Sequence, residues 1–459
     1  MLYGNIWKKS KFFDFKGTRL AVYSRGYILA QRSLVYLPYK HYYKKFEDNG
    51  WENVPAGKPL LFAISHRNAF MDSLSIANVH NTQVWQLARG DAFKQPIMRR
   101  LFYYFHMLPI WRERDGVDTR TSNMPTFEAC ADILGNNGMV GIYPEGNCIN
   151  ERHIRPLKKG ICRIAFQTMV KYNWEIDLFI IPTGVSYKNA ESFKGTQLIN
   201  FGIPINVKDY KNIYLQSNSN AINRLKEDVE SRMKDTVVHI PRGLHHENID
   251  RLSVLLGRSL RIEKGMNDTL SNELNCEQDA VKQLIQLESE KPAIFAEAVH
   301  IEKAFSNELE KAGLSLRDVD KEEYSISSLG LSGLIHLFSL PLLLVGWLTH
   351  IIPITIVEKL VKKMAGQSIF ISSLRYAFGL GVFLIYYTLI FITLLLVLPV
   401  WWWAFPSIVL LPILGNLAWF VYDGISKWFK LISIKPWKRN GPYQKLRKYL
   451  IELKGKLPV

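Results

Sequence analysis

Two adjacent apolar runs near the C-terminus constrain the fold most, because each is long enough to cross a membrane. Residues 376–398 and 399–422 contain no formally charged side chain, and about 20 apolar residues suffice for a helix to span the hydrocarbon layer. In such a layer the backbone polar groups of a single run must be satisfied within a helix. The two runs therefore predict a hairpin of transmembrane helices at 376–398 and 401–422, with the tryptophan-rich stretch Pro399–Pro406 as its turn.

An earlier uncharged run, residues 329–357, is also long enough to span but is interrupted by Pro341 and Pro353. Basic clusters near membrane segments prefer the cytoplasmic side, and both flanks of the hairpin are basic: Lys359, Lys362, Lys363 and Arg375 precede it, and residues 423–459 carry ten basic against two acidic residues. A full crossing by the earlier run would put one of the regions around these segments on the opposite side. We therefore expect 331–354 to be re-entrant or confined to one leaflet, with a transmembrane helix as the alternative.

The charge balance and the aromatic content together favour membrane lipids over nucleic acid as partners. Lys and Arg number 58 against 41 Asp and Glu, a surplus of 17 positive charges, and aromatic residues make up 12% of the chain. A basic surplus attracts phosphate-rich surfaces, which are either nucleic acid or anionic headgroups. No zinc-finger spacing, basic zipper or RNA-binding aromatic signature occurs in the sequence, so nucleic acid is not expected to bind.

The cysteines and the N-terminus indicate a reducing compartment for the part outside the membrane. Cys130, Cys148, Cys162 and Cys276 form no CxxC pair, which predicts neither a disulfide framework nor a zinc site. The remaining His, Asp and Glu residues show no ligand spacing, so no metal is expected. The stretch Lys8–Phe13 lacks the apolar core and cleavage site of a secretory signal. We expect an integral membrane protein whose N-terminal domain lies on the cytoplasmic face.

Changes in charge and apolarity divide the chain into five zones. Residues 1–58 are basic and aromatic, a pattern typical of an amphipathic segment on a membrane surface; a helix that docks on the following domain is the alternative. Residues 59–215 alternate short apolar runs with longer periodic segments, and residues 216–327 are polar and helical. Membrane segments occupy 328–425, and a basic cytoplasmic tail occupies 426–459.

The second zone predicts an α/β fold with a mixed or parallel sheet flanked by helices. Its predicted strands are Leu60–Ser65, Gln83–Ala88, Met139–Tyr143 and Leu178–Tyr187, and its predicted helices are Ala69–Val79, Gln95–Phe105, Pro125–Leu134 and Lys158–Lys171. In the third zone Ile222, Leu225, Val229 and Met233 recur at helical spacing, so its first part packs an apolar stripe. The role of the rest is open between a lid, a docking surface, a spacer and a plain helical appendage.

The stretch Ser65–Asp72 carries the strongest chemical signal because it follows a predicted apolar strand directly. A histidine has the near-neutral pKa that a general base needs to deprotonate a hydroxyl. A nearby carboxylate fixes the tautomer of such a histidine and stabilises its protonated form. His66 and Asp72 have these residue types, although a pair six positions apart is common in core and surface positions as well.

Three further blocks strengthen this interpretation: Pro109-Ile110-Trp111-Arg112, Tyr143-Pro144-Glu145-Gly146 and Ile181-Pro182-Thr183-Gly184. Together with Ser65–Asp72, and in this order, they resemble the four motifs of the lysophospholipid and glycerol-phosphate acyltransferase superfamily over roughly residues 40–210. The resemblance implies that His66 is the base and Asp72 its partner. It also implies that Arg112, Glu145 and Gly146 contact the phosphate and glycerol portion of the acceptor, and that Pro182 lies on the acyl side.

The sequence departs from the commonest family pattern in two places. Five residues, rather than four, separate His66 from Asp72, which is similar to the subgroup with fungal-type and some bacterial glycerol-phosphate acyltransferases. Asn147-Cys148 stands where the third motif usually continues with an arginine. We expect Arg155 and Lys158, near a predicted helix start, to replace that arginine at a phosphate.

Several neighbouring residues have competing interpretations. Arg89 matches a position that is basic in related enzymes, but it could equally pair with Asp91 on the surface; Arg112 could instead pair with Glu113 or Asp115. Glu145 could hold its own loop. Cys148 has no evident base in the sequence and is interpreted as a passive small residue, while His153, among basic neighbours, is expected to be solvated or at the edge of the phosphate.

The resemblance implies an O-acyltransferase of phospholipid synthesis that needs no cofactor. Its donor would be a fatty acyl thioester on coenzyme A or an acyl carrier protein, and its acceptor glycerol 3-phosphate or the 1-acyl derivative. One alternative is an acceptor hydroxyl on a monoacylated amino-acid lipid, motivated by the missing arginine of the third motif. A non-catalytic, lipid-binding membrane scaffold is an alternative of another class.

Overall fold

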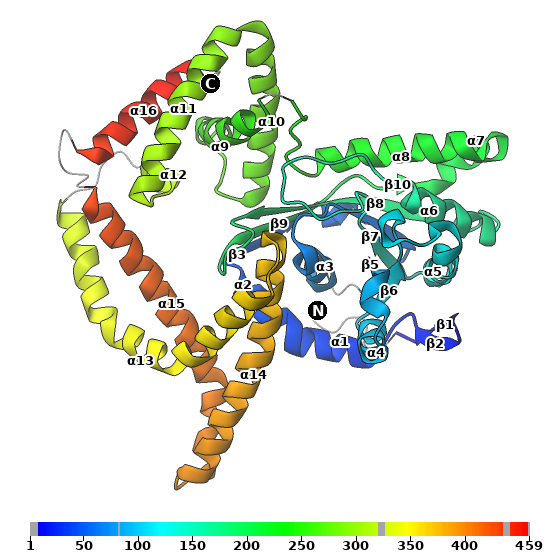
Figure 1. Ribbon diagram of the computed structural model, residues 1–459, viewed down its shortest axis with the longest axis horizontal. Coiled ribbons are helices and arrows are strands. Elements are labelled where there is room, and N and C mark those ends of the chain that lie inside the picture. Colours follow the sequence, from blue (N-terminus) through cyan, green and yellow to red (C-terminus); the bar gives the residue numbers. More distant parts are fainter. Residues whose placement is uncertain (1–7, 81–82, 244, 320–325, 435–440, 458–459) are drawn as a thin grey trace. The chain divides into compact units, whose positions relative to one another are not determined.

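The computed structural model describes residues 8–80, 83–243, 245–319, 326–434 and 441–457 (Figure 1). These residues form two compact units. The first takes in the chain up to Pro241 together with Thr269–Leu274 and Gly366–Tyr376; the second comprises Arg242–Asp268, Asn275–Ala365 and the chain from Ala377 onward. Two short pieces of the C-terminal half therefore fold with the N-terminal unit.

An eight-stranded sheet organises the first unit, in the order β3-β9-β8-β4-β7-β5-β6 with β10 added beside β8. Strand β4 lies inside the sheet and is parallel to both neighbours, whereas β8 is antiparallel to β9 and β10. The mixed sheet of the predicted α/β fold is confirmed. Its strands are β3 Lys45–Asn49, β4 Leu60–Ile64, β5 Val84–Arg89, β6 Met107–Ile110, β7 Met139–Ile142, β8 Phe179–Lys188, β9 Thr196–Phe201 and β10 Ile205–Asn206.

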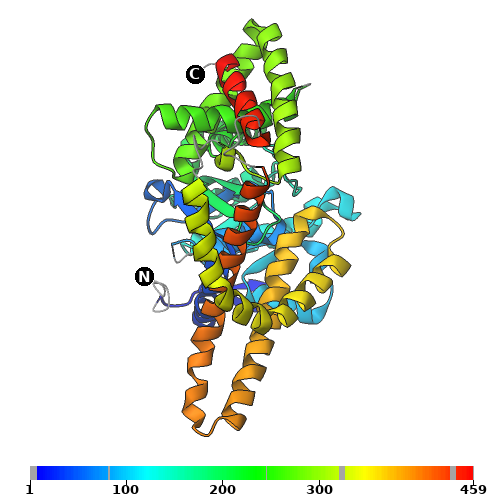
Figure 2. The same cartoon turned by 90° about the vertical axis from the view of Figure 1, so that its left-hand side faces the viewer.

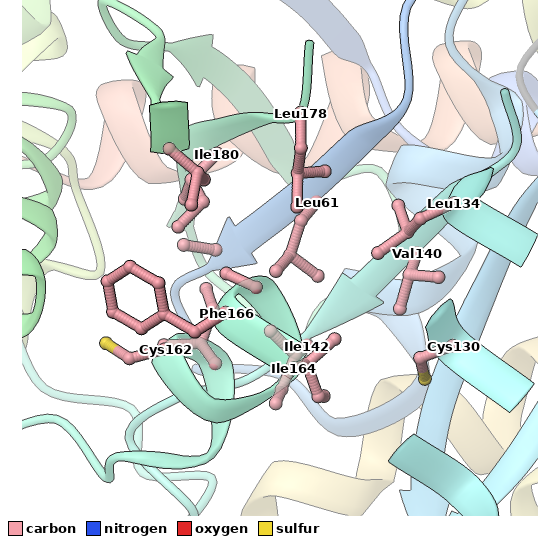
Figure 3. Packing of buried hydrophobic residues seen from close by; sticks show 14 of the residues in the cluster. Leu61, Cys130, Leu134, Val140, Ile142, Cys162, Ile164, Phe166, Leu178 and Ile180 are labelled. Atoms are coloured by element: carbon pink, nitrogen blue, oxygen red, sulfur yellow. The ribbon is translucent and has the colours of Figure 1, made fainter. Parts of the chain in front are cut away.

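Every residue of β4 is buried, because both faces of the sheet are covered. Leu61 packs with helices α5 and α6, where it meets Ile164, Phe166 and Leu134 (Figure 3). Phe62 points to the opposite face, as alternation along a strand requires. Because both faces are covered, the sequence of this strand is apolar without interruption. The helices between the strands are α3 Ala69–Asn78, α4 Pro96–Tyr104, α5 Thr119–Gly135 and α6 Gly160–Lys171.

The expected boundary at residue 59 is wrong, because the sheet already includes β3. Before it come a hairpin (β1 Phe12–Phe15, β2 Thr18–Ala21), α1 Arg25–Ala30, the π-helix η1 Gln31–Tyr36 and α2 Leu37–Tyr42. Phe13 and Phe15 are buried in the same cluster as Leu61, so the aromatic residues of this zone serve the domain core. Leu29, Leu34 and Leu37 remain exposed, and contact of this segment with a membrane surface stays a prediction.

The boundary at residue 215 also differs. The predicted apolar stripe is confirmed: Leu225, Val229 and Met233 are fully buried in the core of the first unit, and Ile222 is partly buried against it. They lie on α8 Asn218–Asp235, which follows the short α7 Lys211–Gln216. Helix α8 therefore belongs to the α/β unit, which reaches Pro241.

The helices of the second unit outside the apolar segments are α9 His246–Glu263, most of α10 Leu270–Glu290, α11 Pro292–Ala312, α12 Leu316–Val319 and the C-terminal α16 Pro442–Lys456. Phe295, Ile301 and Phe305 of α11 are buried, and so are Leu446 and Leu453 of α16. Helices α11 and α16 lie side by side (Figures 1 and 2). Ion pairs from Lys445 to Glu308 and from Lys456 to Glu297 join them, so part of the basic tail neutralises the acidic zone.

Within the described residues, three helices are long and apolar enough to cross a membrane: Leu329–Met364, Ser368–Val397 and Trp401–Ser433. They correspond to α13 Ile326–Met364, α14 Ile371–Val397 and α15 Pro406–Ser433. Helices α14 and α15 form the predicted hairpin, and the turn η7 Trp401–Ala404 exposes its three tryptophans (Figure 2).

Helix α13 is continuous over 39 residues with Pro341 and Pro353 inside it, and it is bent in both views (Figures 1 and 2). Proline removes one helical hydrogen bond and is a common cause of such bends. Helix α15 approaches α13 closely through small residues: a Cβ placed on Gly346 would lie 2.3 Å from that of Ala418.

Candidate active site

The carboxyl ends of five strands meet at one edge of the sheet, because β4, β5, β6, β7 and β8 run parallel. In open α/β sheets this edge, beside the point where the strand order reverses, is where ligands bind. The residues that follow these ends include His66 after β4, Arg112 after β6 and Glu145 after β7. Three distant parts of the sequence thus converge.

His66 and Asp72 form a hydrogen-bonded pair. His66 Nδ1 lies 2.9 Å from Asp72 Oδ2, and the exposed fraction of the side chain is 19% for the histidine and 0% for the aspartate. The loop Ser65–Asn68 carries the histidine, and Asp72 lies in the first turn of α3, where the helix dipole stabilises a carboxylate. Because Nδ1 is engaged, Nε2 is the atom that can accept a proton from a substrate.

The carboxylate of Asp72 takes part in four hydrogen bonds. Its Oδ2 also accepts from the backbone N–H groups of Arg67 at 2.8 Å and Asn68 at 2.9 Å, and its Oδ1 accepts from Tyr187 Oη at 2.6 Å. These four bonds fix the orientation of the carboxylate beside the imidazole.

This environment changes the pKa of His66. Burial lowers the pKa, but the hydrogen bond and charge of Asp72, with a contribution from the nearby Cys148, outweigh burial and raise the pKa to about 9. A base of this strength takes a proton from an alcohol more readily than an ordinary imidazole does. Below about pH 9 the imidazole of His66 is mostly protonated, so only its unprotonated fraction can act as the base.

A chain of hydrogen bonds behind Asp72 was not foreseen from the sequence. Gln197 Nε2 donates to Tyr187 Oη at 2.9 Å, and Tyr39 Oη donates to Gln197 Oε1 at 2.6 Å. Burial raises the pKa of Tyr187 well above its ordinary value, so its hydroxyl remains a donor to Asp72. The sequence held one signal for this chain of hydrogen bonds: Tyr187 lies in the same predicted strand as Pro182.

Glu145 braces the loop that carries His66. Its Oε1 accepts from the backbone N–H of His66 at 3.0 Å, and its Oε2 accepts from Arg155 N at 3.2 Å and Arg155 Nε at 3.0 Å. Gly146 follows with φ of 76°, a left-handed conformation that glycine adopts without steric cost. The loop-holding interpretation of Glu145 is thus supported by contacts.

Arg155 and Lys158 lie at this loop. Arg155 Nη2 donates to the carbonyl of Asn147, whereas Arg155 Nη1 is buried and has no hydrogen-bond partner in the described part of the chain. A buried donor without an acceptor is costly, and a ligand oxygen would satisfy it. The exposed Lys158 side chain runs over Gly146, with its Cγ 3.5 Å from the position of a Cβ there.

Arg89 and Arg112 are both paired with a nearby aspartate, as their alternative interpretations predicted. Arg89 is 56% exposed and makes a two-pronged contact with Asp91, with Nε 3.1 Å from Oδ1. Arg112 Nη2 lies 2.9 Å from Asp115 Oδ1. Burial, and then the positive charges of Arg112 and Arg89, lower the pKa of Arg114. Three guanidinium groups therefore share one region, and two of them are paired with an aspartate.

Two other expectations concern Pro182 and His153. Pro182 is buried within β8 beside Ala63, and its carbonyl accepts from Gly202 N at 2.8 Å; an acyl-side role for it stays a prediction. The His153 ring stacks on His239 at 4.8 Å, and its Nδ1 lies 2.8 Å from the Ile240 carbonyl. These contacts give His153 a place in local packing.

Cys148 is closer to the chemistry than its sequence context indicated. Its Sγ accepts from Ala69 N at 3.1 Å, and one ligand atom each of His66, Asp72 and Cys148 lie within 4.8 Å of one another. Such a triplet could hold a metal ion in principle. An ion there would have to displace hydrogen bonds that Asp72 already makes.

Residues 45–186 match the family model of the Acyltransferase family. The chain is 27% identical over 110 residues to Glycerol-3-phosphate O-acyltransferase 1 of Saccharomyces cerevisiae, a match that covers 23% of this chain and 14% of that protein. It is 24% identical over 123 residues to Glycerol-3-phosphate O-acyltransferase 2 of the same organism, covering 27% of this chain and 16% of the relative. The chain thus matches less than a fifth of the length of either relative.

A solved structure also overlaps with part of the chain. The 1-acyl-sn-glycerophosphate (LPA) acyltransferase PlsC from Thermotoga maritima is 14% identical with a TM-score of 0.31, over 42% of this chain and 71% of that one.

Proposed function

Because this chain carries the acyltransferase domain of the glycerol-phosphate and lysophospholipid acyltransferase superfamily, we propose that it is an O-acyltransferase of phospholipid synthesis. It transfers a fatty acyl group from a thioester, on coenzyme A or an acyl carrier protein, to a hydroxyl of glycerol 3-phosphate or its 1-acyl derivative. The observation that carries the proposal is the pairing of His66 Nδ1 with the buried carboxylate of Asp72 at 2.9 Å.

In the proposed reaction His66 Nε2 takes the proton of the acceptor hydroxyl while that oxygen attacks the thioester carbonyl. Asp72 stabilises the imidazolium that forms. The tetrahedral intermediate then collapses: the new ester forms, the carbon–sulfur bond breaks, and the leaving thiolate takes the proton back from His66. No acyl-enzyme and no cofactor are needed in this scheme.

Arg155 and Lys158 are proposed to bind the phosphate of the acceptor. The unpaired Arg155 Nη1 and the exposed Lys158 flank the loop whose Glu145 supports His66. A phosphate there would bring the glycerol hydroxyl near the imidazole, and guanidinium groups suit phosphate oxygens geometrically. Arg89 and Arg112 would have to leave their aspartates before they could assist.

The acceptor can be identified by offering the purified full chain one acyl-coenzyme A and a mixed pool of acceptors. The pool contains glycerol 3-phosphate, 1-acyl-glycerol 3-phosphate and a hydroxylated monoacylated amino-acid lipid, and mass spectrometry identifies the products. We expect acylated glycerol phosphates. Acylation of the amino-acid lipid alone would contradict the proposed acceptor. If no thiol is released from the acyl-coenzyme A with any of the acceptors, a non-catalytic scaffold is favoured.

Replacing Lys158 with alanine should raise the KM for the phosphate-bearing acceptor by about tenfold and leave kcat nearly unchanged, because one charge-assisted hydrogen bond to the phosphate is lost. Steady-state kinetics at two salt concentrations measures this, since added salt weakens an exposed charge contact in the parent chain. Lys159→Ala removes the same charge one residue further on and serves as the matched control. Equal KM values for the two variants would exclude Lys158 from the phosphate site.

The protein is proposed to lie in the membrane with the first unit on the cytoplasmic face and α13 re-entrant. Two pieces of the first unit, Thr269–Leu274 and Gly366–Tyr376, lie before and after α13 in the sequence. In the earlier piece Leu270 N donates to Glu47 at 2.6 Å, and Glu273 forms an ion pair with Lys188. Among the described residues between the two pieces, α13 is the one helix long and apolar enough to span. If both pieces stay with the first unit, α13 must begin and end on one side of the membrane.

A cysteine introduced by Lys362→Cys should therefore be shielded from a membrane-impermeant maleimide in intact cells and should react after permeabilisation. Trp402→Cys, in the turn of the hairpin, should react in intact cells and serves as the comparison. The parent chain gives the background from its four cysteines. Labelling of position 362 from outside would overturn the re-entrant arrangement.

A further inference from the structure

The segment Gly366–Tyr376, which follows α13 and includes the first turns of α14, packs against the loop that carries the catalytic pair. Ser372 Oγ donates to Asn68 Oδ1 at 2.6 Å. Tyr376 Oη donates to the Val35 carbonyl at 2.8 Å, and Arg375 donates to the Glu191 carbonyl. All of these residues belong to the first unit.

Asn68 connects this segment to the catalytic pair. Its backbone N–H donates to Asp72 Oδ2 at 2.9 Å. As the residue preceding α3 it could cap the helix with its side chain, but it makes no capping bond. Instead its Nδ2 donates to the Ala190 carbonyl at 3.0 Å, and its Oδ1 accepts from Ser372. Both Asn68 and Ser372 are 1% exposed, so water cannot easily replace either partner.

The loop needs such support because its backbone is strained. Ala69 has φ of 31°, a value that a residue with a Cβ rarely adopts and that persists only where surrounding contacts enforce it. On one side the Ala69 N–H donates to Cys148 Sγ at 3.1 Å. On the other side Asn68 is fixed by Ala190 and Ser372. Loss of the serine hydroxyl would release one of these restraints.

We propose that Ser372 is a positioning residue that acts through Asn68 on the His66–Asp72 pair, so that the first turn of the apolar helix α14 forms part of the catalytic apparatus. This inference rests on the proposed function, because it assumes that His66 is the base. Ser372 itself lies behind the loop and touches neither reacting group; its effect is on the orientation of the imidazole and carboxylate.

Adjacent serines provide a matched test. Ser373 is also buried, but its Oγ has no hydrogen-bond partner in the described part of the chain. Ser372→Ala should lower kcat by about tenfold with both KM values within twofold, since a misaligned base weakens only the transition state. Ser373→Ala should leave kcat and KM within about twofold of the parent chain, and Ser372→Thr, which keeps a hydroxyl, should restore most of the lost kcat.

A double-mutant cycle with Asn68→Ala separates positioning from general stability. In the Asn68→Ala background, Ser372→Ala should have no further effect on kcat, because the partner is already absent. Equal kcat for the two serine variants, independent effects in the cycle, or a kcat loss that only follows the loss of folded protein in thermal unfolding would each overturn the inference. His66→Ala is assayed alongside: if it stays active the proposed function fails, whereas an inactive His66→Ala with a normal Ser372→Ala removes the positioning role alone.

Discussion

Replacing His66 with alanine should lower kcat by roughly three orders of magnitude, within the range that a general base contributes. The imidazole Nε2 is the proton acceptor in the proposed reaction, whereas Tyr187, the other side chain hydrogen-bonded to the Asp72 carboxylate, donates to it and is no base. The measurement is steady-state release of thiol from the acyl thioester with saturating acceptor. Extraction from the membrane and thermal unfolding should match the parent chain.

The chain offers a matched control for this variant. His80 Nε2 lies 2.6 Å from Asp48 Oδ2, with both side chains about one-third exposed, so His80→Ala removes a second histidine–aspartate pair far from the chemistry. It should keep kcat within about twofold, as expected for a surface change. Activity of His66→Ala within tenfold of the parent would refute His66 as the base.

Replacing Asp72 with asparagine should change both the maximal rate and its dependence on pH. The maximal rate should fall by two to four orders of magnitude, roughly, because the tautomer and the imidazolium lose their partner. In the parent chain His66 works only when unprotonated, so kcat/KM should rise with pH and level off above about 9, the pKa raised by Asp72. Without the carboxylate the charge and hydrogen bond that raise the pKa are gone, and the remaining burial lowers it.

The rising limb of the Asp72→Asn profile should therefore move to lower pH while its plateau lies far below that of the parent. Profiles of kcat/KM measured with a donor kept well below its KM test this, since they report on the unliganded enzyme. An unchanged midpoint would show that Asp72 does not set the pKa of the base. A fall in rate with no shift of the limb would assign Asp72 to the fold of α3 rather than to the chemistry.

The catalytic pair was predictable because it is local. A strand end, a short loop and the first turn of a helix fix the distance from His66 to Asp72 once β4 and α3 are recognised. Glu145 follows the same logic, since it comes directly after the predicted strand that became β7. Arg112 follows β6, a strand that the apolar pattern did not reveal, and Pro182 lies inside β8. Parallel pairing brings the ends of β4, β6 and β7 to one edge.

The hydrogen bonds behind the pair were not predictable for a related reason. Tyr39, Gln197 and Ser372 reach the site from far along the chain, and their contacts depend on strand register and on how the segment Gly366–Tyr376 folds back. Periodicity carries no information about such register. The same limit explains the wrong domain boundary at residue 59. An amphipathic or aromatic pattern shows that one face of a segment is buried but not what covers it. Here β3 is part of the sheet and Phe13 is part of the core of the α/β unit.

Basic residues were the least certain part of the site because charge alone does not distinguish a ligand contact from an internal ion pair. Arg89 and Arg112 meet an aspartate two and three residues away, a short-range pairing that was visible in the sequence. The distinctive feature of Arg155 is a buried nitrogen without an acceptor, and that could only be seen in three dimensions.

The packing of α16 on α11 has a consequence for biogenesis. The apolar stripe of α11 is made by the ribosome before α13, α14 and α15, yet the helix that covers it follows all three. Nascent chains expose such stripes until their partners emerge, and exposed stripes are prone to aggregate. The packing of α16 on α11 can therefore form only after all three apolar helices have been translated, so the stripe of α11 lacks this cover throughout their synthesis.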